Sequence, residues 1–385
     1  MGPLTLFPAH RTGVPVKTPR TAPALLALAL LVPAFAFAQE ESPVLPAVSG
    51  AVFAMISDGA GGWYLGGDFE KVGGIRRSRL AHVLADQTLS LWNPGADGPV
   101  HALALGEGVL YVGGDFRRAG GQKRARLAAV DAATGLATGF RPDPDGAVLA
   151  LALSGRTLYA GGEFSKIAGV ERLHVASIEV TGGLAELWNP ETDGAVRTIA
   201  LDEDKAYLGG SFSHVHGLPR GRLAVVDRER GAPELWNPRA DGVVLALAVS
   251  GGTVYAGGSF TRIGGQERSG LAALNASTGY AGLWNPGTNG PVFALALRDG
   301  LVYAGGCFTE VRGLDRAHLA AVDAVTGVPE LWRPEADNTV LAIGMSGGTL
   351  MAAGAFTRIT GLDRAGLAPL DAASGQALLW TRGVQ

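Results

Sequence analysis

The feature that most constrains this 385-residue chain is a repeat of 48 residues. Six tryptophans are spaced by 48 residues or a multiple of 48: Trp92, Trp188, Trp236, Trp284, Trp332 and Trp380. Phe140 occupies the one position in this series that lacks a tryptophan. A second landmark, Y-x-G-G-x-F, recurs in six copies, starting with "YLGGDF" at 64–69, and a worn seventh copy, "MAAGAF", lies at 351–356. Periods of 20–50 residues are typical of solenoids, propellers and arrays, in which neighbouring copies share a core.

One copy shows the local structure that we expect in all of them. A first strand is predicted at 292–297 ("VFALAL"), a second at 301–311, a third at 317–323 and a fourth at 329–332. Glycine, aspartate and asparagine cluster at the junctions, as hairpin turns require. No segment has an apolar stripe of 3.6-residue period, so almost no helix is expected. Four short antiparallel strands per copy predict one propeller blade. Seven copies over residues 50–385 therefore predict an all-β, seven-bladed β-propeller.

The glycine pair sits in the middle of the predicted second strand. Because glycine weakens a strand, a repeated pair indicates that another group approaches the backbone closely there. We expect either the neighbouring blade or an aromatic ring. The candidate rings are the phenylalanine that follows the pair and the fourth-strand tryptophan.

The first 38 residues differ from the repeat. Three basic residues precede an apolar run at 22–38 that ends in Ala-Phe-Ala, the pattern of a cleaved secretory signal. We therefore expect a signal peptide over 1–38, a linker over 39–49 and no membrane span after cleavage. The mature protein is then secreted, periplasmic or held at the cell surface. An uncleaved membrane anchor is the alternative. Cys307 is the only cysteine, so no intrachain disulfide can close the fold.

Two charged positions recur on what we expect to be one face of the disc. An arginine begins each predicted third strand: Arg77, Arg124, Arg172, Arg220, Arg268, Arg316 and Arg364. An aspartate, once replaced by asparagine, precedes six first strands: Asp97, Asp145, Asp193, Asp241, Asn289 and Asp337. We interpret these residues, like the tryptophans, as structural, with the acids forming Asx turns and pairing with the forked arginines. Most of the arginines are expected to bond either to an aspartate of this set or to a turn carbonyl. A ring of cation ligands around the channel is the alternative.

Function is better sought where the copies differ. Asp68, Asp115 and Glu163 follow the glycine pair in the first three copies, and the later copies have Ser211, Ser259, Cys307 and Ala355 there. These acids either form an acidic sector beside the channel or satisfy local backbone donors. We favour the second interpretation.

The residues that break the repeat on the loop face are our candidate ligand-binding residues: Arg79, Lys123, Arg126, His174, His214, His216, Arg222 and His318. They predict a locally basic face, despite a net charge of −3, and hence an acidic partner. His174, His214 and His216 also permit a metal-site hypothesis, because residues two apart on a strand point the same way and imidazoles bind zinc. The simpler interpretation is that they are exposed loop histidines.

The succession "YxGGxF … GGxxR … LAALDxxTG … LWNP … DGPV" resembles the delta-60 repeat β-propeller family of exported bacterial proteins, over residues 50–385. The resemblance implies a propeller and an exterior location, and no particular activity. "AALNASTGYAGLW", at 272–284, is more weakly similar to the tryptophan-docking motif of quinoprotein dehydrogenases. That likeness implies that each tryptophan docks one blade onto the next.

No metalloprotease H-E-x-x-H or haem-attachment C-x-x-C-H motif accompanies the repeat. There is also no basic run that would indicate nucleic acid. The predicted loops are short and uniform, without an insertion that could build a lid. We therefore predict a non-catalytic binding or scaffold module that needs no cofactor and binds a protein or a glycan. The alternative is an enzyme that uses the channel mouth, either a metal-dependent hydrolase or lyase or a quinoprotein-like enzyme.

Overall fold

The computed structural model describes residues 47–378, and these form an all-β structure in which no helix occurs. The expectation of almost no helix is confirmed for this part of the chain. The predicted signal peptide (1–38), most of the predicted linker (39–49) and Trp380 lie outside the described residues. Within 47–378 the strands make thirteen small sheets, and all their pairings are antiparallel.

Seven of these sheets, which we call blades 1–7 in chain order, contain an inner, a middle and an outer strand. The inner strands are β1 (Val48–Ser57), β5 (Val100–Gly106), β10 (Val148–Ser154), β15 (Val196–Leu201), β20 (Val244–Ser250), β25 (Val292–Arg298) and β30 (Val340–Ser346). The middle strands are β2 (Trp63–Val72), β6 (Val109–Gly114), β11 (Thr157–Gly162), β16 (Lys205–Gly210), β21 (Thr253–Gly258), β26 (Leu301–Gly306) and β31 (Thr349–Gly354). The outer strands are β4 (Leu80–Val83), β9 (Leu127–Asp131), β14 (Val175–Glu179), β19 (Leu223–Asp227), β24 (Leu271–Asn275), β29 (Leu319–Asp323) and β34 (Leu367–Asp371).

A two-stranded hairpin follows the middle strand in blades 2–7, and in blade 1 the short β3 (Ile75–Arg76) pairs with β2 itself. The hairpins are β7–β8 (Arg118–Ala119, Gln122–Lys123), β12–β13 (Lys166–Ile167, Val170–Glu171), β17–β18 (His214–Val215, Leu218–Pro219), β22–β23 (Arg262–Ile263, Gln266–Glu267), β27–β28 (Glu310–Val311, Leu314–Asp315) and β32–β33 (Arg358–Ile359, Leu362–Asp363).

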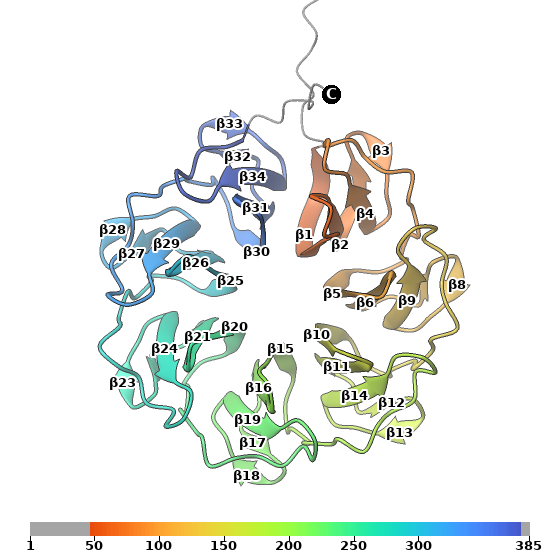
Figure 1. Cartoon of the computed structure of the whole chain (residues 1–385), viewed down its shortest axis with the longest axis horizontal. Coiled ribbons are helices and arrows are strands. Elements are labelled where there is room, and N and C mark those ends of the chain that lie inside the picture. The colour runs from red at the N-terminus through yellow and green to blue at the C-terminus, as the bar shows by residue number, and fades with distance from the viewer. Residues whose placement is uncertain (1–46, 379–385) are drawn as a thin grey trace, which may run out of the picture. The chain divides into compact units, whose positions relative to one another are not determined.

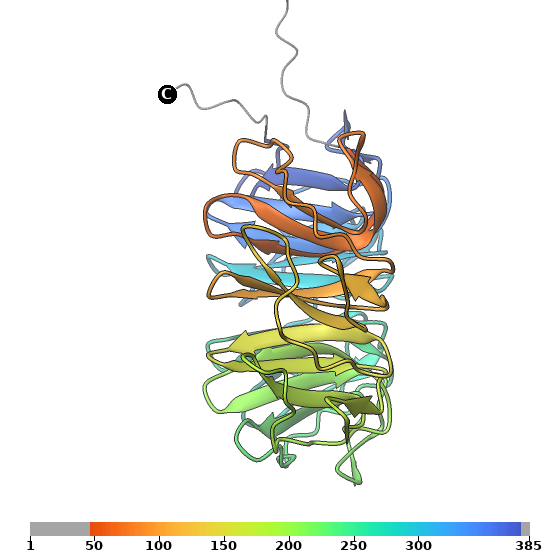
Figure 2. The same ribbon diagram turned by 90° about the vertical axis from the view of Figure 1, so that its right-hand side faces the viewer.

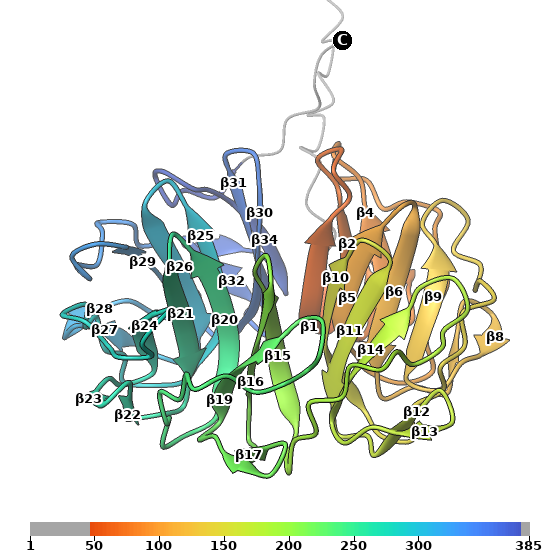
Figure 3. The same cartoon turned by 60° about the horizontal axis from the view of Figure 1, so that its bottom comes forward.

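The blades are arranged around a common centre, with the inner strands nearest the centre and the hairpins toward the rim, so the fold is a β-propeller (Figure 1). Seen from the side, the blades form a disc (Figure 2). Several hairpins, among them β12–β13 and β17–β18, gather toward one face of this disc (Figure 3). Because successive strands are antiparallel, the inner strands begin and the middle strands end at the same face, which we call the loop face.

The predicted fourth strand is much shorter than expected. In blade 2 it is reduced to one bridge, between Val130 and Ala137, flanked by backbone hydrogen bonds from Asp131 to Leu136 and from Thr138 to Ala129. Similar single bridges occur in the other blades. The chain leaves the sheet after this bridge because the aromatic residue that follows is buried against the next blade.

The glycine pair is explained by two different close contacts. A methyl group added to Gly257 would lie only 2.7 Å from Cγ1 of Val292, which belongs to the next blade. One added to Gly258 would strike the carbonyl oxygen of Val243, beside a β-bulge in the blade's own inner strand, and would lie 3.1 Å from the ring of Phe260. The neighbouring blade and the following phenylalanine are therefore confirmed as close neighbours. The fourth-strand tryptophan is wrong as a candidate, because it reaches the next blade elsewhere.

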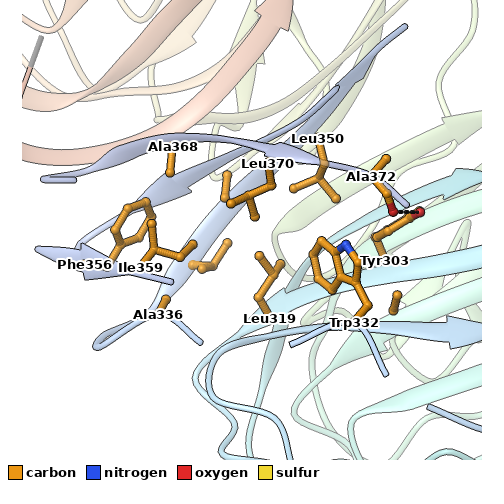
Figure 4. Close-up of a cluster of buried hydrophobic side chains, with 13 residues drawn as sticks. Tyr303, Leu319, Trp332, Ala336, Leu350, Phe356, Ile359, Ala368, Leu370 and Ala372 are labelled. Carbon is orange, nitrogen blue, oxygen red and sulfur yellow. Dashed lines mark hydrogen bonds between the residues drawn. The ribbon is translucent and has the colours of Figure 1, made fainter. Parts of the chain in front are cut away.

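The hydrophobic core lies between the blades, and Figure 4 shows the part shared by blades 6 and 7. Trp332 Nε1 donates to the carbonyl of Asp371 at 3.3 Å, and the Tyr303 hydroxyl donates to the carbonyl of Ala372 at 2.8 Å. The two rings meet edge to face with their centroids 5.3 Å apart. The same indole bond, from the tryptophan to the next blade, is made by Trp92, Trp188, Trp236 and Trp284. Tryptophan docking is thus confirmed for these five residues.

Blade 1 packs against blade 7 through a backbone hydrogen bond that recurs between other neighbouring blades, as from Ala96 to Ser78 and from Ala240 to Gly221, and through one side-chain contact of its own. The amide of Val48 donates to the carbonyl of Ala365 at 3.0 Å, so the first strand begins two residues before the predicted boundary at residue 50. The indole of Trp63, which is 2% exposed, covers the backbone of Gly344 in the inner strand of blade 7. At the position of Gly344 the five preceding blades have alanine: Ala104, Ala152, Ala200, Ala248 and Ala296.

Candidate functional site: the channel mouth

The inner strands of all seven blades line a central cavity of about 250 Å³. Where this cavity opens at the loop face, each blade contributes two residues. One is the second residue of the repeated inner-strand segment, and the other is the residue after the glycine pair. We call these residues of blades 1–7 the channel mouth. Its inner-strand members are Phe53, His101, Leu149, Arg197, Leu245, Phe293 and Leu341, and its middle-strand members are Asp68, Asp115, Glu163, Ser211, Ser259, Cys307 and Ala355.

The three acids of the mouth are each held by an arginine. Asp68 lies 3.2 Å from Nε of Arg79, and Asp115 lies 3.2 Å from Nε of Arg126. Glu163 lies 3.5 Å from Arg197, which belongs to the inner strand of blade 4. No backbone amide of the described residues donates to these three side chains, so the favoured interpretation, that they satisfy local backbone donors, is wrong. About half of each carboxylate side chain is exposed, so water screens the pairs and the acids stay accessible to a ligand.

His101 and Arg197 were missed as candidates by the sequence analysis. Both occupy an inner-strand position that is Leu or Phe in the other blades. His101 stacks on Phe53 with the ring centroids 5.4 Å apart and the planes at 19°. Burial lowers the pKa of His101, although the nearby carboxylates of Asp115 and Glu163 act in the opposite direction. The signal was present in the sequence, because "VHALAL" and "VRTIAL" put a polar residue into an otherwise apolar run.

The mouth is chemically divided. Blades 1–4 contribute the charged side chains described above. Blades 5–7 contribute Leu245, Phe293 and Leu341 from the inner strands, and Ser259, Cys307 and Ala355 from the middle strands. One half of the opening is therefore charged and the other half is largely apolar.

Five of the eight predicted ligand-binding residues occupy one equivalent position, directly before the outer strand. These residues, Arg79, Arg126, His174, Arg222 and His318, all have a positive φ, between 59° and 65°. Blades 5 and 7 have Gly270 and Gly366 at the same position, with φ of 68° and 74°. A side chain in this left-handed region is uncommon, and such strain is often found at functional sites.

The other three predicted residues lie away from the mouth. Lys123 is in β8 and His214 in β17, and His216 follows in the turn of the same hairpin. His214 Nδ1 is 2.9 Å from both Asp193 and Ser213. No group of three or more His, Cys, Asp or Glu side chains within residues 47–378 is placed to hold a metal ion. The metal site at His174, His214 and His216 is therefore wrong, because the hairpin separates the last two from the start of the outer strand.

The predicted basic character of the loop face is largely compensated near the mouth. Arg79, Arg126 and Arg197 each have a carboxylate partner. Arg222, at the position equivalent to Arg79, donates instead to the carbonyl of Ala240 and forms no ion pair with a described residue.

In blades 2–7 the repeated aspartates, with Asn289 in blade 6, join the start of the inner strand to the hairpin that follows the middle strand. Oδ1 of Asp193 accepts hydrogen bonds from the amides of Ser213 and His214 at 2.7 and 2.8 Å, and Oδ2 accepts from the Ser213 hydroxyl at 2.6 Å. Partial burial raises the pKa of Asp193, but these hydrogen bonds outweigh it and hold the pKa well below its usual range. Asp97, Asp145, Asp241, Asn289 and Asp337 make the equivalent amide bonds. The predicted Asx turns are wrong, because the bonded amides are 20 and 21 residues away.

The repeated arginines bind carbonyls of their own blade and not the aspartates. Arg172, for example, donates to the carbonyls of Glu171 and Glu186, both at 2.8 Å. The bond to a carbonyl 14 residues along recurs at Arg124, Arg220, Arg268 and Arg316. The predicted pairing of the arginines with the aspartates is therefore wrong, whereas the other predicted kind of partner, a backbone carbonyl, is the one that these arginines use. The alternative of a cation-binding ring is disfavoured because the carboxylates already accept hydrogen bonds.

A His–Asp pair and a G-x-S-x-G sequence are features that occur in enzymes with a nucleophilic serine or cysteine, and both are present in this chain. His82 Nε2 lies 2.9 Å from Asp58 in blade 1, stacked on Tyr64, but no hydroxyl or thiol of the described residues bonds to His82. Residues 344–348 match the G-x-S-x-G pattern of a nucleophile elbow. They span the last three residues of β30 and the two-residue turn to β31, with no helix following, so the elbow geometry is absent.

Comparisons with known proteins support the fold. No family model matches the chain, so the resemblance to the delta-60 repeat family stays a prediction. No curated protein matches it either. Similar solved structures include the computationally designed Ika8 protein, with a TM-score of 0.55 and 17% identity over 87% of each chain. They also include the extracellular domain of BT4673 from B. thetaiotaomicron, with a TM-score of 0.54 and 14% identity over 84% of this chain and 38% of that one.

The WD40 domain of Neurospora crassa Pan2 is similar as well, with a TM-score of 0.52 and 10% identity over 79% of this chain and 86% of that one. WD40 domains are β-propellers. At these identities the comparisons show a shared propeller fold and carry no function. In residues 47–378 no helix has the length and apolar character needed to cross a membrane.

Proposed function

We propose that this chain is an exported, non-catalytic binding module, built as one closed seven-bladed propeller of 48-residue repeats of the delta-60 type. The contacts of Val48 and Trp63 with blade 7 support closure of the ring. The resemblance and the N-terminal signal pattern support export to the periplasm, the cell surface or the medium.

The ligand site of this module is the channel mouth. The observation that carries this proposal is the division of the mouth into a charged and an apolar half on a scaffold that otherwise repeats. The backbone positions are equivalent in all blades, so packing imposes the same requirement on each of them. Packing alone therefore does not explain why blades 1–3 have acids at this position while blades 5–7 have mainly apolar residues at the mouth. A rigid mouth of this kind suits a partner, either a protein segment or a glycan, that presents a polar group beside an apolar one.

Binding fits this mouth better than catalysis does. Its carboxylates are each paired with an arginine and are about half exposed, whereas catalytic groups are usually clustered in a concave site that shields them from water. His101 is the exception, and it keeps the enzyme alternative testable. No cofactor is required by the proposed function.

The experiment compares the wild-type protein with a mouth variant on a glycan array and against a displayed peptide library. The mouth variant carries residues that the repeat itself uses: Asp68→Ser, Asp115→Ser, Glu163→Ser, His101→Leu and Arg197→Leu. Arg230→Ala, at an exposed turn on the opposite face, is the matched control.

We expect ligands selected by the wild-type protein to be lost by the mouth variant and retained by the control. Ligands that bind the mouth variant equally well would show that the site is elsewhere. Chemical conversion of a bound ligand by the wild-type protein, absent in the mouth variant, would instead favour the enzyme.

A further inference from the structure

A second hollow lies at the rim of the propeller, between blades 4 and 5. It is a groove of about 510 Å³, larger than the central cavity. Its walls are the segment 235–239 after the outer strand of blade 4, the hairpin β22–β23 of blade 5, and the turn at 278–280. We call it the rim groove. None of its residues belongs to the channel mouth.

The rim groove exposes two large apolar side chains. Leu235 is 98% exposed and Tyr280 is 70% exposed. Tyr280 is the one tyrosine of the sequence that does not precede a glycine pair. The equivalent residues of the other blades are Thr88, Leu136, Leu184, Ala232, Val328 and Gln376. The junction between blades 4 and 5 therefore differs from the other junctions, because it has an aromatic ring in the groove wall.

The same junction departs from the repeat in charge. Arg239 occupies a position that is glycine or an acid in the other blades: Gly95, Asp143, Glu191, Gly287 and Glu335. No ion pair among the described residues involves Arg239. Arg262, also in the groove wall, is paired with Glu267 at 3.2 Å.

A third arginine close to Arg239 adds to the uncompensated positive charge. Arg220 is only 7% exposed, and its guanidinium donates to the carbonyls of Pro219 and Glu234 rather than to a carboxylate. Burial lowers the pKa of Arg220, and the charge of Arg239 lowers it further. An anion bound at Arg239 would relieve this repulsion between like charges.

We propose that the rim groove docks an acidic, extended peptide segment of a protein partner. A carboxylate of the segment binds the free guanidinium of Arg239, whose forked donors suit a planar anion. A neighbouring apolar side chain of the segment packs between Leu235 and Tyr280. Tyrosine and arginine are the residue types most often found as energetic anchors of protein interfaces, which favours a peptide over a glycan.

The test uses a fluorescein-labelled peptide, Gly-Glu-Leu-Glu-Leu-Gly with blocked ends, and fluorescence anisotropy with the protein purified from the full chain. A peptide with glutamine in place of both glutamates is the neutral comparison, and an oligomer of glucuronic acid is the glycan comparison. The protein variants are Arg239→Glu and Tyr280→Leu. Both introduce residues that the repeat already has at equivalent positions, as in Glu191 and Leu136, so the fold is expected to tolerate them.

The matched control is Arg333→Gln, which changes an exposed rim arginine that is already paired with Glu335 at 2.6 Å. We expect the acidic peptide to bind at least tenfold more tightly than the neutral one. Arg239→Glu and Tyr280→Leu should each weaken its binding about tenfold, the loss expected of one charge-assisted or anchoring contact. Arg333→Gln should leave binding unchanged.

Equal binding of the two peptides, no binding of the acidic peptide at millimolar concentration, or no effect of Arg239→Glu would overturn the proposal. Binding of the glucuronate oligomer that Arg239→Glu abolishes, without binding of the peptide, would make the groove a glycan site and also overturn it. The mouth variant should bind the acidic peptide normally, so failure here and failure of the proposed function can be told apart.

Discussion

Replacing Gly344 by alanine is expected to destabilise the protein, although the repeat argues for the opposite result. Alanine is the residue at this position in blades 2–6, and replacing a strand glycine by alanine ordinarily stabilises by about 0.5–1 kcal/mol. In blade 7, however, the new methyl carbon would lie 2.8 Å from Cη2 of Trp63 and closer still to Cζ3. Carbon atoms prefer separations of about 3.5–4.0 Å, so the indole or one of the two strands must move.

The cost can be bounded from packing data. Overpacking of this kind costs about 1–3 kcal/mol, which outweighs the gain in backbone entropy, so we expect Gly344→Ala to lower the free energy of unfolding by about 1–2 kcal/mol. Trp63→Leu introduces the residue that blades 2 and 3 have, Leu110 and Leu158, and should cost about 1–3 kcal/mol through the cavity it leaves. The double variant, Gly344→Ala with Trp63→Leu, has the alanine and leucine that pack together between blades 2 and 3, Ala104 and Leu158. It should therefore be more stable than the sum of the two single effects predicts, by about 1–2 kcal/mol.

Urea unfolding followed by far-ultraviolet circular dichroism measures these differences, with tryptophan fluorescence to check that the transitions coincide. Ala296→Gly, the reverse change at the equivalent position of blade 6, is the control for backbone propensity alone. If Gly344→Ala is as stable as the wild type, or if the effects of the two single changes add, then the Trp63 indole does not fill the space over Gly344 and the account of the junction between blades 7 and 1 is refuted.

Three further outcomes follow from the structure. Gly257→Ala should lower the free energy of unfolding by about 1–3 kcal/mol in the same urea assay because of its contact with Val292; a neutral effect would contradict the explanation of the glycine pair. Asp241 has a pKa lowered by hydrogen bonds that outweigh partial burial, so its contribution to stability is present above the unfolded pKa of about 3.9 and is lost as pH falls. The steepness of acid unfolding should thus decrease in Asp241→Asn, and an unchanged pH profile would contradict this. The imidazole of His101 should titrate below about 6.5 in an NMR experiment, because burial disfavours its charged form; a higher value would show that the neighbouring carboxylates dominate.

Much of the fold could be predicted from the repeat, because strands and turns follow from local patterns. The predicted first strand at 292–297 agrees with β25, and the predicted third strand agrees with β29 to within two residues. The predicted second strand was too long, since β26 ends at the glycine pair and a separate hairpin follows. The pattern of apolar residues continues through both elements and so does not reveal where pairing to the inner strand stops.

The candidate site was predicted less completely. Arg79 and Arg126 were found as departures from the repeat, and the structure places both against acids of the mouth. His101 and Arg197 were not predicted, because binding residues were expected on the loop face and these two residues lie within strands. The histidines at 214 and 216 were given weight by their spacing alone, and spacing says nothing about the bend that carries them away.

The amino-acid sequence by itself determined the period of the protein, its all-β character and the residue types that dock neighbouring blades. These properties depend on periodicity, on turn chemistry and on which side chains must be buried, and each of them is expressed within a few dozen residues. Only the tertiary structure decided which atoms meet across a junction. The aspartates bond to amides 20 residues away, the acids of the mouth pair with arginines, and Trp63 lies over Gly344 at the far end of the described chain. Such contacts depend on distances between separately formed strands, to within about an ångström, and no local pattern in the chain encodes those distances.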